Sequence, residues 1–197
     1  MKPRVVILFS GEGTNLQKLL EDLPPMGIEV AAAITNRPRA PGIKRAESFG
    51  VPVEVIDHTL YESREAFDAV LVERIEKYTP HLTVTAGFMR ILTPVFTDRI
   101  RAVNIHPSLL PKYKGAKAIE QAYESGDIVC GVSVHWVTGE LDGGTVIAQA
   151  SFERTEAMDA AAFEAAVHDL EYELLPRTVA DLLGGGDGLE AAVRTLA

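Results

Sequence analysis

Cysteine and positive charge are both scarce in this chain of 197 residues. Cys130 is its one cysteine, which excludes an internal disulfide and argues against a metal centre built from several thiolates. Because Cys130 falls in an apolar stretch, we interpret it as a small core residue rather than a nucleophile. Lys and Arg together number 19 against 28 Asp and Glu, a formal net charge of -9. That balance argues against general nucleic-acid binding but leaves small anionic ligands possible.

Long hydrophobic runs are missing as well. No apolar stretch approaches the roughly 18 residues that a membrane span needs, and residues 1–4 lead directly into a strand pattern instead of a signal peptide. We therefore expect a cytoplasmic protein with no membrane association. A hydrophobic content of 47%, a charged content of 24% and a mean hydropathy of +0.08 are typical of a globular chain. The length fits one domain with a sizeable core.

Short apolar runs alternate with amphipathic segments along most of the chain. The first run, residues 4–9, is rich in β-branched residues and predicts a strand buried on both faces of a parallel sheet. The remaining strands are predicted at residues 29–35, 53–56, 82–86, 103–106, 132–137 and 145–150, and the helices at 16–23, 43–49, 63–78, 118–124 and from 159 onward. The last two strands read as a hairpin. The pattern predicts an α/β fold.

A glycine loop follows the first strand and precedes the first helix. In the stretch Ser10 to Asn15, glycines interrupt the apolar pattern before leucines recur at helical spacing. Such a loop directs backbone amides and a helix N-terminus at one point, which suits a phosphate, although glycines also serve simple tight turns. Leu16 stands where the dinucleotide fingerprint needs its third glycine, and no Gly-Lys-Ser/Thr follows. A ligand smaller than NAD or ATP is therefore favoured.

A polar pair interrupts the fifth predicted strand. Asn104 and His106 are two residues apart, so they point to the same face, and Pro107 ends the strand directly after them. An amide donor beside an imidazole suits a site where negative charge develops on a carbonyl oxygen. An isolated pair of this kind can equally be an Asn that ties down a turn and a His bonded to backbone.

Three further features have two interpretations each. Asp142 precedes Gly143-Gly144 in a turn, so turn chemistry is its first interpretation. His135 is either a buried histidine with satisfied hydrogen bonds or part of a site wall. The apolar stretch 87–92 follows the fourth strand, at the edge where open α/β sheets bind ligands, and it is either core or a surface for a flat aromatic ring.

Taken together, these stretches resemble the folate-dependent formyltransferases. The segment Asn104-Ile105-His106-Pro107-Ser108-Leu109-Leu110-Pro111, followed by Glu140-Leu141-Asp142-Gly143-Gly144, carries the resemblance, and within that superfamily the chain is most similar to the phosphoribosylglycinamide formyltransferases. The similarity extends from residues 9–17 through 63–65 and 86–92 to the last helix. It implies a single Rossmann-like domain over residues 1–184, with a mostly parallel twisted sheet of about seven strands flanked by helices, and a tail over residues 185–197.

The resemblance also assigns residues. It implies that Asn104, His106 and Asp142 are catalytic. It implies that the phosphate and the rest of the ribonucleotide substrate are bound by Gly13, Thr14, Asn15 and Glu171. It implies that the folate is bound by Arg64, Met89, Arg90, Ile91, Leu92 and Asn104. The stretch 115–119 departs from the histidine-containing segment of many relatives, so no contacts are carried over to it.

The implied reaction moves a formyl group from 10-formyltetrahydrofolate to the amine of glycinamide ribonucleotide, a step of purine biosynthesis. Its chemistry needs an oxyanion stabiliser and a proton acceptor, which an Asn, a charged His and an Asp can supply. No metal is expected, because the five histidines are scattered without a two-His spacing on one helix face. The expected partners are the two small-molecule substrates, with no nucleic acid and no membrane, and the chain is expected to be a monomer or a homodimer.

Other activities share parts of this pattern. Methionyl-tRNA formyltransferases have the same catalytic three but normally add a basic C-terminal domain. Formyltetrahydrofolate hydrolases have the same core behind a regulatory domain. We expect neither addition in a chain of 197 residues with net charge -9. A non-catalytic phosphoribosyl-binding module would keep the glycine loop but have no use for Asn104, His106 and Asp142 on one crevice.

Overall fold

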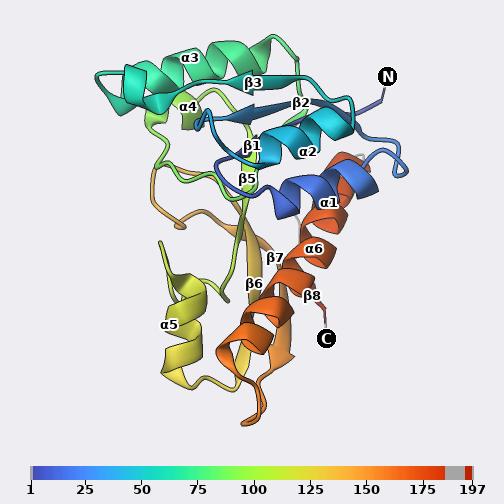
Figure 1. Cartoon of the computed structure of the whole chain (residues 1–197), viewed down its shortest axis with the longest axis vertical. Helices are drawn as coiled ribbons and strands as arrows, with labels where there is room; N and C mark the ends of the chain where they lie inside the picture. Colours follow the sequence, from blue (N-terminus) through green and yellow to red (C-terminus); the bar gives the residue numbers. More distant parts are fainter. Residues whose placement is uncertain (1, 185–193, 197) are drawn as a thin grey trace. The chain divides into compact units, whose positions relative to one another are not determined.

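The computed structural model describes residues 2–184 and 194–196, and of residues 194–196 only the backbone (Figure 1). Its contacts divide the chain into two compact units, Met1–Val103 with Val137–Gly139 and Asn104–Trp136 with Glu140–Ala197. We call these the first unit and the second unit. The boundary between them lies within strand β5 (Ala102–His106).

The first unit alternates strands and helices. In chain order its elements are β1 (Arg4–Phe9), α1 (Thr14–Asp22), β2 (Glu29–Thr35), α2 (Gly42–Ser48), β3 (Val53–Val55), the 3₁₀ turn η1 (His58–Leu60), α3 (Arg64–Glu76), β4 (Leu82–Thr85) and α4 (Pro94–Thr97). The strands lie in the order β3-β2-β1-β4, and all pairs are parallel. Each strand is connected to the next by a helix, as parallel neighbours require.

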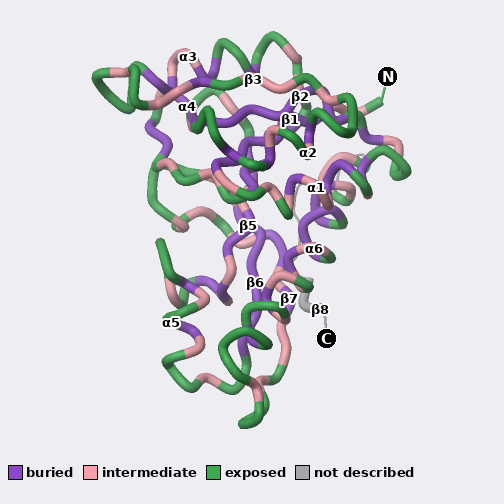
Figure 2. Tube along the Cα trace, in the orientation of Figure 1, coloured by how far each residue is buried: buried purple, intermediate pink, exposed green. Residues whose placement is uncertain are grey.

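Both faces of this parallel sheet are buried, which explains the unbroken apolar runs. Val6 and Leu8 belong to a core cluster with Phe67 and Leu71 of α3 and Phe96 of α4. Buried residues accordingly follow the strands (purple in Figure 2). Helix α3 begins after Ser63, whose hydroxyl caps the helix by accepting a hydrogen bond from the Ala66 amide at 3.1 Å, and this confirms the predicted start of the helix.

The second unit contains the end of β5 and the elements α5 (Ala118–Ser125), β6 (Val129–Trp136), β7 (Val146–Glu153), α6 (Ala160–Gly184) and β8 (Arg194–Leu196). β6 and β7 pair antiparallel, which confirms the predicted hairpin, and β8 pairs parallel with β7. Helix α6 packs on β6 and β7. Phe163 of α6 joins this packing through edge-on ring contacts with Tyr123 of α5 and Phe152 of β7.

The predicted α/β class with a mostly parallel sheet is confirmed. The described chain has eight strands where about seven were predicted, because β8 lies within the predicted tail. The turn η1 and the short helix α4 were not predicted, and β6 begins at Val129, three residues before the predicted start. Residues 185–193 and 197 of the predicted tail lie outside the described residues. The division into a domain at 1–184 and a tail stays a prediction.

Candidate active site

Four polar side chains meet where β5 and β6 end in the second unit. The Asn104 amide nitrogen lies 3.1 Å from His135 Nε2, and the same ring nitrogen lies 3.5 Å from Asp142 Oδ1. Asp142 Oδ2 in turn lies 3.4 Å from His106 Nδ1. The structure thus brings the three predicted catalytic residues together and adds His135 to them. The side chains of His106, His135 and Asp142 are all at least nine-tenths buried.

The hydrogen bonds of His106 favour a doubly protonated ring. Its Nε2 lies 2.8 Å from the carbonyl oxygen of Tyr113, and a carbonyl can only accept, so Nε2 carries a hydrogen. Nδ1 faces the Asp142 carboxylate. A neutral ring with its one hydrogen on Nε2 would turn a lone pair toward that carboxylate, whereas an imidazolium presents an N–H. The geometry therefore suits a cationic His106 paired with Asp142.

Asp142 is held as an anion by its neighbours. Burial by itself raises the pKa of this carboxyl, but the interaction with His135, the hydrogen bond from the Gly115 amide at 2.8 Å and the charge of His106 together bring the pKa below its usual value. The backbone of Asp142 has a φ of 48°, in the left-handed region that Asp and Asn tolerate better than most residues. The residue is thus both part of a turn and a member of the buried cluster.

His135 satisfies both interpretations that its sequence allowed. Its Nδ1 lies 2.9 Å from the carbonyl oxygen of Trp136 and donates to it. Its Nε2 faces both the Asn104 amide nitrogen and the Asp142 carboxylate. The ring is 3% exposed, so it is a satisfied core histidine that also forms one wall of the cluster.

Backbone groups of one loop complete the cluster, and sequence reasoning missed them. The Tyr113 carbonyl accepts from His106, and the Gly115 amide donates to Asp142. Two further bonds hold the loop: Ser108 Oγ donates to the Lys112 carbonyl at 2.6 Å, and Lys114 pairs with Glu140 at 3.0 Å. Every residue has a backbone carbonyl, and nearly every residue has a backbone amide, so no residue type marks the position of these groups.

The glycine loop of the first unit leads directly into the N-terminus of helix α1. Gly13 adopts a φ of 72° as the N-cap of α1, and a Cβ at this position would lie 2.8 Å from the backbone of Gly42. Only glycine fits there without displacement. Thr14 and Asn15 are the first two residues of α1, so their amides belong to the helix N-terminus. The Arg45 guanidinium supports the loop from α2 by donating to the Glu12 carbonyl at 2.7 Å.

The stretch 87–92, which we call the rim loop, lies beside the glycine loop. The Ser10 amide donates to the Gly87 carbonyl at 3.0 Å, and the Met89 amide donates to the Ser10 hydroxyl at 2.8 Å. Ser10 also donates to the Asn36 side-chain oxygen. Met89 and Ile91 are 66% and 45% exposed, whereas Leu92 is buried. The rim loop thus presents apolar side chains to solvent, as a surface for an aromatic ring would.

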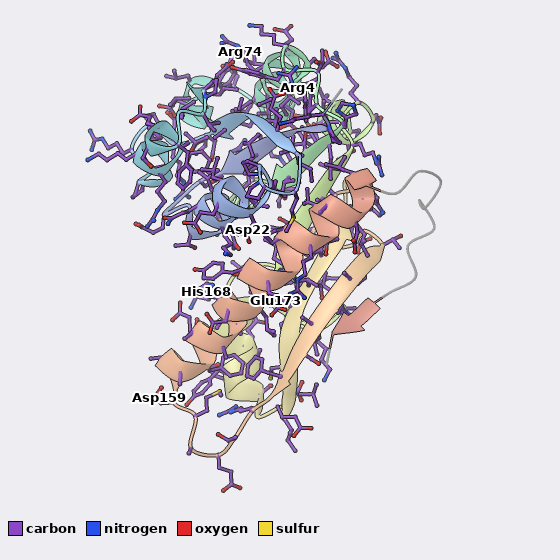
Figure 3. All side chains as sticks on the ribbon, turned by 90° about the vertical axis from the view of Figure 1, so that its right-hand side faces the viewer. Arg4, Asp22, Arg74, Asp159, His168 and Glu173 are labelled. Atoms are coloured by element: carbon purple, nitrogen blue, oxygen red, sulfur yellow. The ribbon has the colours of Figure 1, made fainter. Side chains whose placement is uncertain are left out.

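The other predicted contact residues are on helices. Arg64 is the exposed first residue of α3, one turn before Phe67, whose ring lies 4.9 Å from the Arg90 guanidinium of the rim loop. Glu171 of α6 is 4% exposed and accepts from His168 Nδ1 at 2.8 Å. Figure 3 shows His168 partway along α6, between Asp159 at the helix start and Glu173.

Two kinds of feature are absent from the described part of the chain. Within the described residues, no three His, Cys, Asp or Glu side chains are grouped as metal ligands. Among the helices of that same part, none combines the length and the apolar character needed to cross a bilayer.

Comparison with known proteins identifies relatives over most of the chain. Residues 3–179 match the formyl transferase family. Phosphoribosylglycinamide formyltransferase of Escherichia coli (strain K12) is 45% identical over 150 residues, which are 74% of this chain and 71% of that protein. The trifunctional purine biosynthetic protein adenosine-3 of Homo sapiens is 36% identical over 179 residues, 89% of this chain but 18% of that protein. The chain thus corresponds to a small part of the trifunctional protein.

Solved structures agree with these matches. The crystal structure of phosphoribosylglycinamide formyltransferase from Campylobacter jejuni matches with a TM-score of 0.88 at 46% identity, covering 92% of this chain and 98% of that one. Glycinamide ribonucleotide transformylase 1 from Symbiobacterium toebii matches with a TM-score of 0.89 at 36% identity, covering 93% and 89%. Both matches confirm the predicted fold class and the resemblance seen in the sequence. The chain belongs to the formyl transferase family.

Proposed function

We propose that this chain transfers the formyl group of 10-formyltetrahydrofolate to the amine of glycinamide ribonucleotide, as a step of purine biosynthesis. Its relatives in Escherichia coli and Haemophilus influenzae are named phosphoribosylglycinamide formyltransferases, and these names bear out the predicted enzyme class. They favour the ribonucleotide over tRNA or water as formyl acceptor. The observation that carries the mechanism is the buried cluster of Asn104, His106 and Asp142.

The cluster matches the charges that develop during formyl transfer. Attack of the amine nitrogen on the formyl carbon gives a tetrahedral centre with an anionic oxygen and a cationic nitrogen. Asn104 donates to that oxygen through its amide, and His106 donates through its imidazolium. The proton lost by the amine passes to Asp142, directly or through a water, and is then delivered to N10 of the folate. The bond from the formyl carbon to N10 breaks as the anionic oxygen returns to a carbonyl, and N10 leaves as a neutral amine with Asp142 again ionised.

The ribonucleotide is assigned to the glycine loop and to Glu171. Three features support the loop as its phosphate site: the left-handed Gly13, the close approach of Gly42, and the α1 N-terminus formed by Thr14 and Asn15. The carboxylate of Glu171 is held by His168 and suits an interaction with the glycinamide amine.

The folate is assigned to the rim loop and its surroundings. Met89 and Ile91 provide exposed apolar surface for the ring, while Arg90 and Leu92 shape the loop that holds them. Arg64 provides a cation at the start of α3 for a carboxylate of the folate, and Asn104 contacts the formyl end. No metal is required by this mechanism. We further propose that the chain acts in the cytoplasm as a monomer or homodimer, with these two small molecules as its partners.

One assay separates this function from its alternatives. Purified protein is incubated with 10-formyltetrahydrofolate and, in parallel, with glycinamide ribonucleotide, with initiator methionyl-tRNA, or with no acceptor, and tetrahydrofolate release is followed. We expect release only with the ribonucleotide. Release without any acceptor would indicate a hydrolase, and release with the tRNA alone would indicate a methionyl-tRNA formyltransferase. No release under any condition, together with binding of the ribonucleotide, would indicate a binding module.

A further inference from the structure

A buried carboxylate outside the substrate contacts holds the far end of the rim loop. Asp68 of α3 is 0% exposed, and its Oδ2 accepts from both the amide and the hydroxyl of Thr93, at 2.6 and 2.7 Å. Thr93 comes directly after Leu92, the last residue of the rim loop, and is the N-cap of α4. Since Thr93 makes no side-chain capping bond of its own, its hydroxyl is directed to α3 instead.

The surroundings of Asp68 make its carboxylate unfavourable for the stability of the folded state. Its helix neighbours Phe67, Leu71 and Val72 are fully buried in an apolar core, and Asp68 Oδ1 has no hydrogen-bond partner among the described residues. Burial raises the pKa of Asp68, against the opposing effects of the Thr93 bonds and the charge of Arg90. A buried, half-satisfied carboxylate destabilises the folded state relative to an apolar side chain. Its benefit must therefore lie in what it positions.

Arg90 ties the middle of the rim loop to the same place. Its guanidinium lies 4.9 Å from the centre of the Phe67 ring, and its charge acts on Asp68, the next residue of α3. At the near end of the loop, Met89 is fixed by the Ser10 hydroxyl. Both ends and the arginine are thus anchored, while Met89 and Ile91 remain exposed between the anchors.

We propose that Asp68 is a positioning residue for the formyl donor: through Thr93 and Arg90 it holds the rim loop in the shape that receives the folate ring. The inference rests on the proposed function, because it takes the rim loop as the folate surface. An apolar loop that is already ordered before binding loses less entropy when the ring docks on it. Loss of the anchor should therefore weaken binding of the donor far more than binding of the ribonucleotide.

The test compares four variants with the wild-type protein. Asp68→Ala removes the anchor, Asp68→Asn keeps an acceptor oxygen but removes the charge, and Thr93→Val removes the hydroxyl bond. Val72→Ala is the matched control, because Val72 is equally buried on α3 but has no polar group that could accept from Thr93. The measured quantities are the KM for each substrate, kcat, the Kd of tetrahydrofolate, and hydrogen exchange of amides 88–93 in the free protein.

Asp68→Ala should raise both the KM for the formyl donor and the Kd of tetrahydrofolate about tenfold, the usual effect of losing a charge-assisted hydrogen bond. The KM for the ribonucleotide should stay within about twofold of wild type. Exchange at amides 88–93 should speed up. Asp68→Asn and Thr93→Val should give smaller effects in the same direction, and they keep the test valid if Asp68→Ala does not fold. Val72→Ala should lower stability without changing the KM for either substrate.

Two outcomes would overturn the inference while leaving the proposed function intact. One is an equal rise of both KM values in Asp68→Ala. The other is unchanged exchange of the rim loop in all three anchor variants. Failure of the wild-type protein to transfer formyl would instead overturn the proposed function and, with it, the folate role of Asp68. The exchange measurement would still report whether Asp68 orders the loop.

Discussion

Asp142 meets two requirements at a single residue, since it forms a turn and carries the charge of the buried cluster. Its left-handed backbone is one that Asn also adopts readily, so Asp142→Asn preserves the turn while removing the charge. The same substitution removes the partner of the His106 imidazolium and the proposed acceptor of the amine proton. Shape and charge can therefore be separated experimentally.

We expect Asp142→Asn to reduce turnover by the roughly 10²–10⁴-fold that positioned acid–base groups supply, with little change in melting temperature. Single-turnover formyl transfer and thermal unfolding are measured on the same preparation. Asp57→Asn is the matched control, because Asp57 caps the turn η1 by accepting from Thr59 and has no proposed catalytic part. It should lower stability slightly and leave turnover unchanged. A destabilised Asp142→Asn protein with nearly normal transfer would reduce Asp142 to a turn residue.

Gly13 is the second residue whose backbone geometry predicts the effect of a substitution. Gly13→Val places a branched side chain in the left-handed region, at a cost of about 1–2 kcal/mol, and directs its Cβ at Gly42. Because the loop must open to accommodate it, the KM for the ribonucleotide should rise about tenfold or more, as expected for lost hydrogen bonds to a charged group, and the KM for the folate far less. Steady-state kinetics with each substrate varied in turn gives both values.

Gly50→Val is the control for strain at Gly13. Gly50 has a φ of 69° in the same unit, and a Cβ there meets no atom within 4 Å. The Gly50→Val substitution should therefore lower the stability of the protein without changing the KM for either substrate. If Gly13→Val raised both KM values equally, the glycine loop would lose its assignment to phosphate.

At the scale of elements, helix α6 carries an electrostatic pair that should respond to pH. His168 donates to Glu171 and lies 3.6 Å from Glu164, and these carboxylates raise its pKa against the effect of burial. A raised pKa means that the imidazolium stabilises the folded state fully below the ordinary histidine value of about 6.5. That contribution is lost as the pH rises through the value in the folded protein.

His168→Gln should therefore lower the unfolding free energy more at a pH of about 5.5 than at a pH of about 8.5, on either side of the ordinary histidine pKa. The side chain is 36% exposed, so solvent screening keeps the difference at about 1 kcal/mol or less. Denaturant unfolding at both pH values measures it. Glu164→Gln, which removes the more distant carboxylate, should show the same trend with a smaller size. A larger effect at the higher pH would contradict the assignment of charge to His168.

At the scale of the whole molecule, the sequence predicted what depends on hydrophobic period and local chain stiffness. The apolar runs marked the strands, the leucines after Asn15 marked α1, and Ser63 marked the start of α3. The period of two placed Asn104 and His106 on one face, and both join the cluster around Asp142. Asp142 itself came from the resemblance, because nothing local distinguishes it from any other turn carboxylate.

Prediction failed where structure depends on distant or backbone partners. Helix α4 spans only Pro94–Thr97, too short to show a period. The Tyr113 carbonyl and the Gly115 amide are groups that recur along the whole backbone. In the sequence, Asp68 looks like any other polar residue on a surface helix. Only the structure shows that Thr93, 25 positions away, donates to it. The structure identifies such residues only because it brings their partners into contact.

The single hydroxyl of Ser10 has a thermodynamic consequence for both substrates. Ser10 is the first residue of the glycine loop and is 1% exposed, and its hydroxyl accepts a hydrogen bond from the Met89 amide of the rim loop. A ligand that shifts one loop therefore acts on the other. Coupling of this kind is reciprocal. We expect glycinamide ribonucleotide to lower the Kd of tetrahydrofolate by about fivefold, the lower end of typical coupling, and tetrahydrofolate to lower the Kd of the ribonucleotide by the same factor.

Titration calorimetry of each ligand with and without the other measures this factor. In Ser10→Ala the factor should fall to one, even where each ligand alone still binds. Equal factors for the two orders of addition verify that both titrations reached equilibrium. Coupling that survives in Ser10→Ala would place its route elsewhere. If the coupling runs through Ser10, the enzyme binds each substrate more tightly when the other is already bound, and so favours the complex in which both are present.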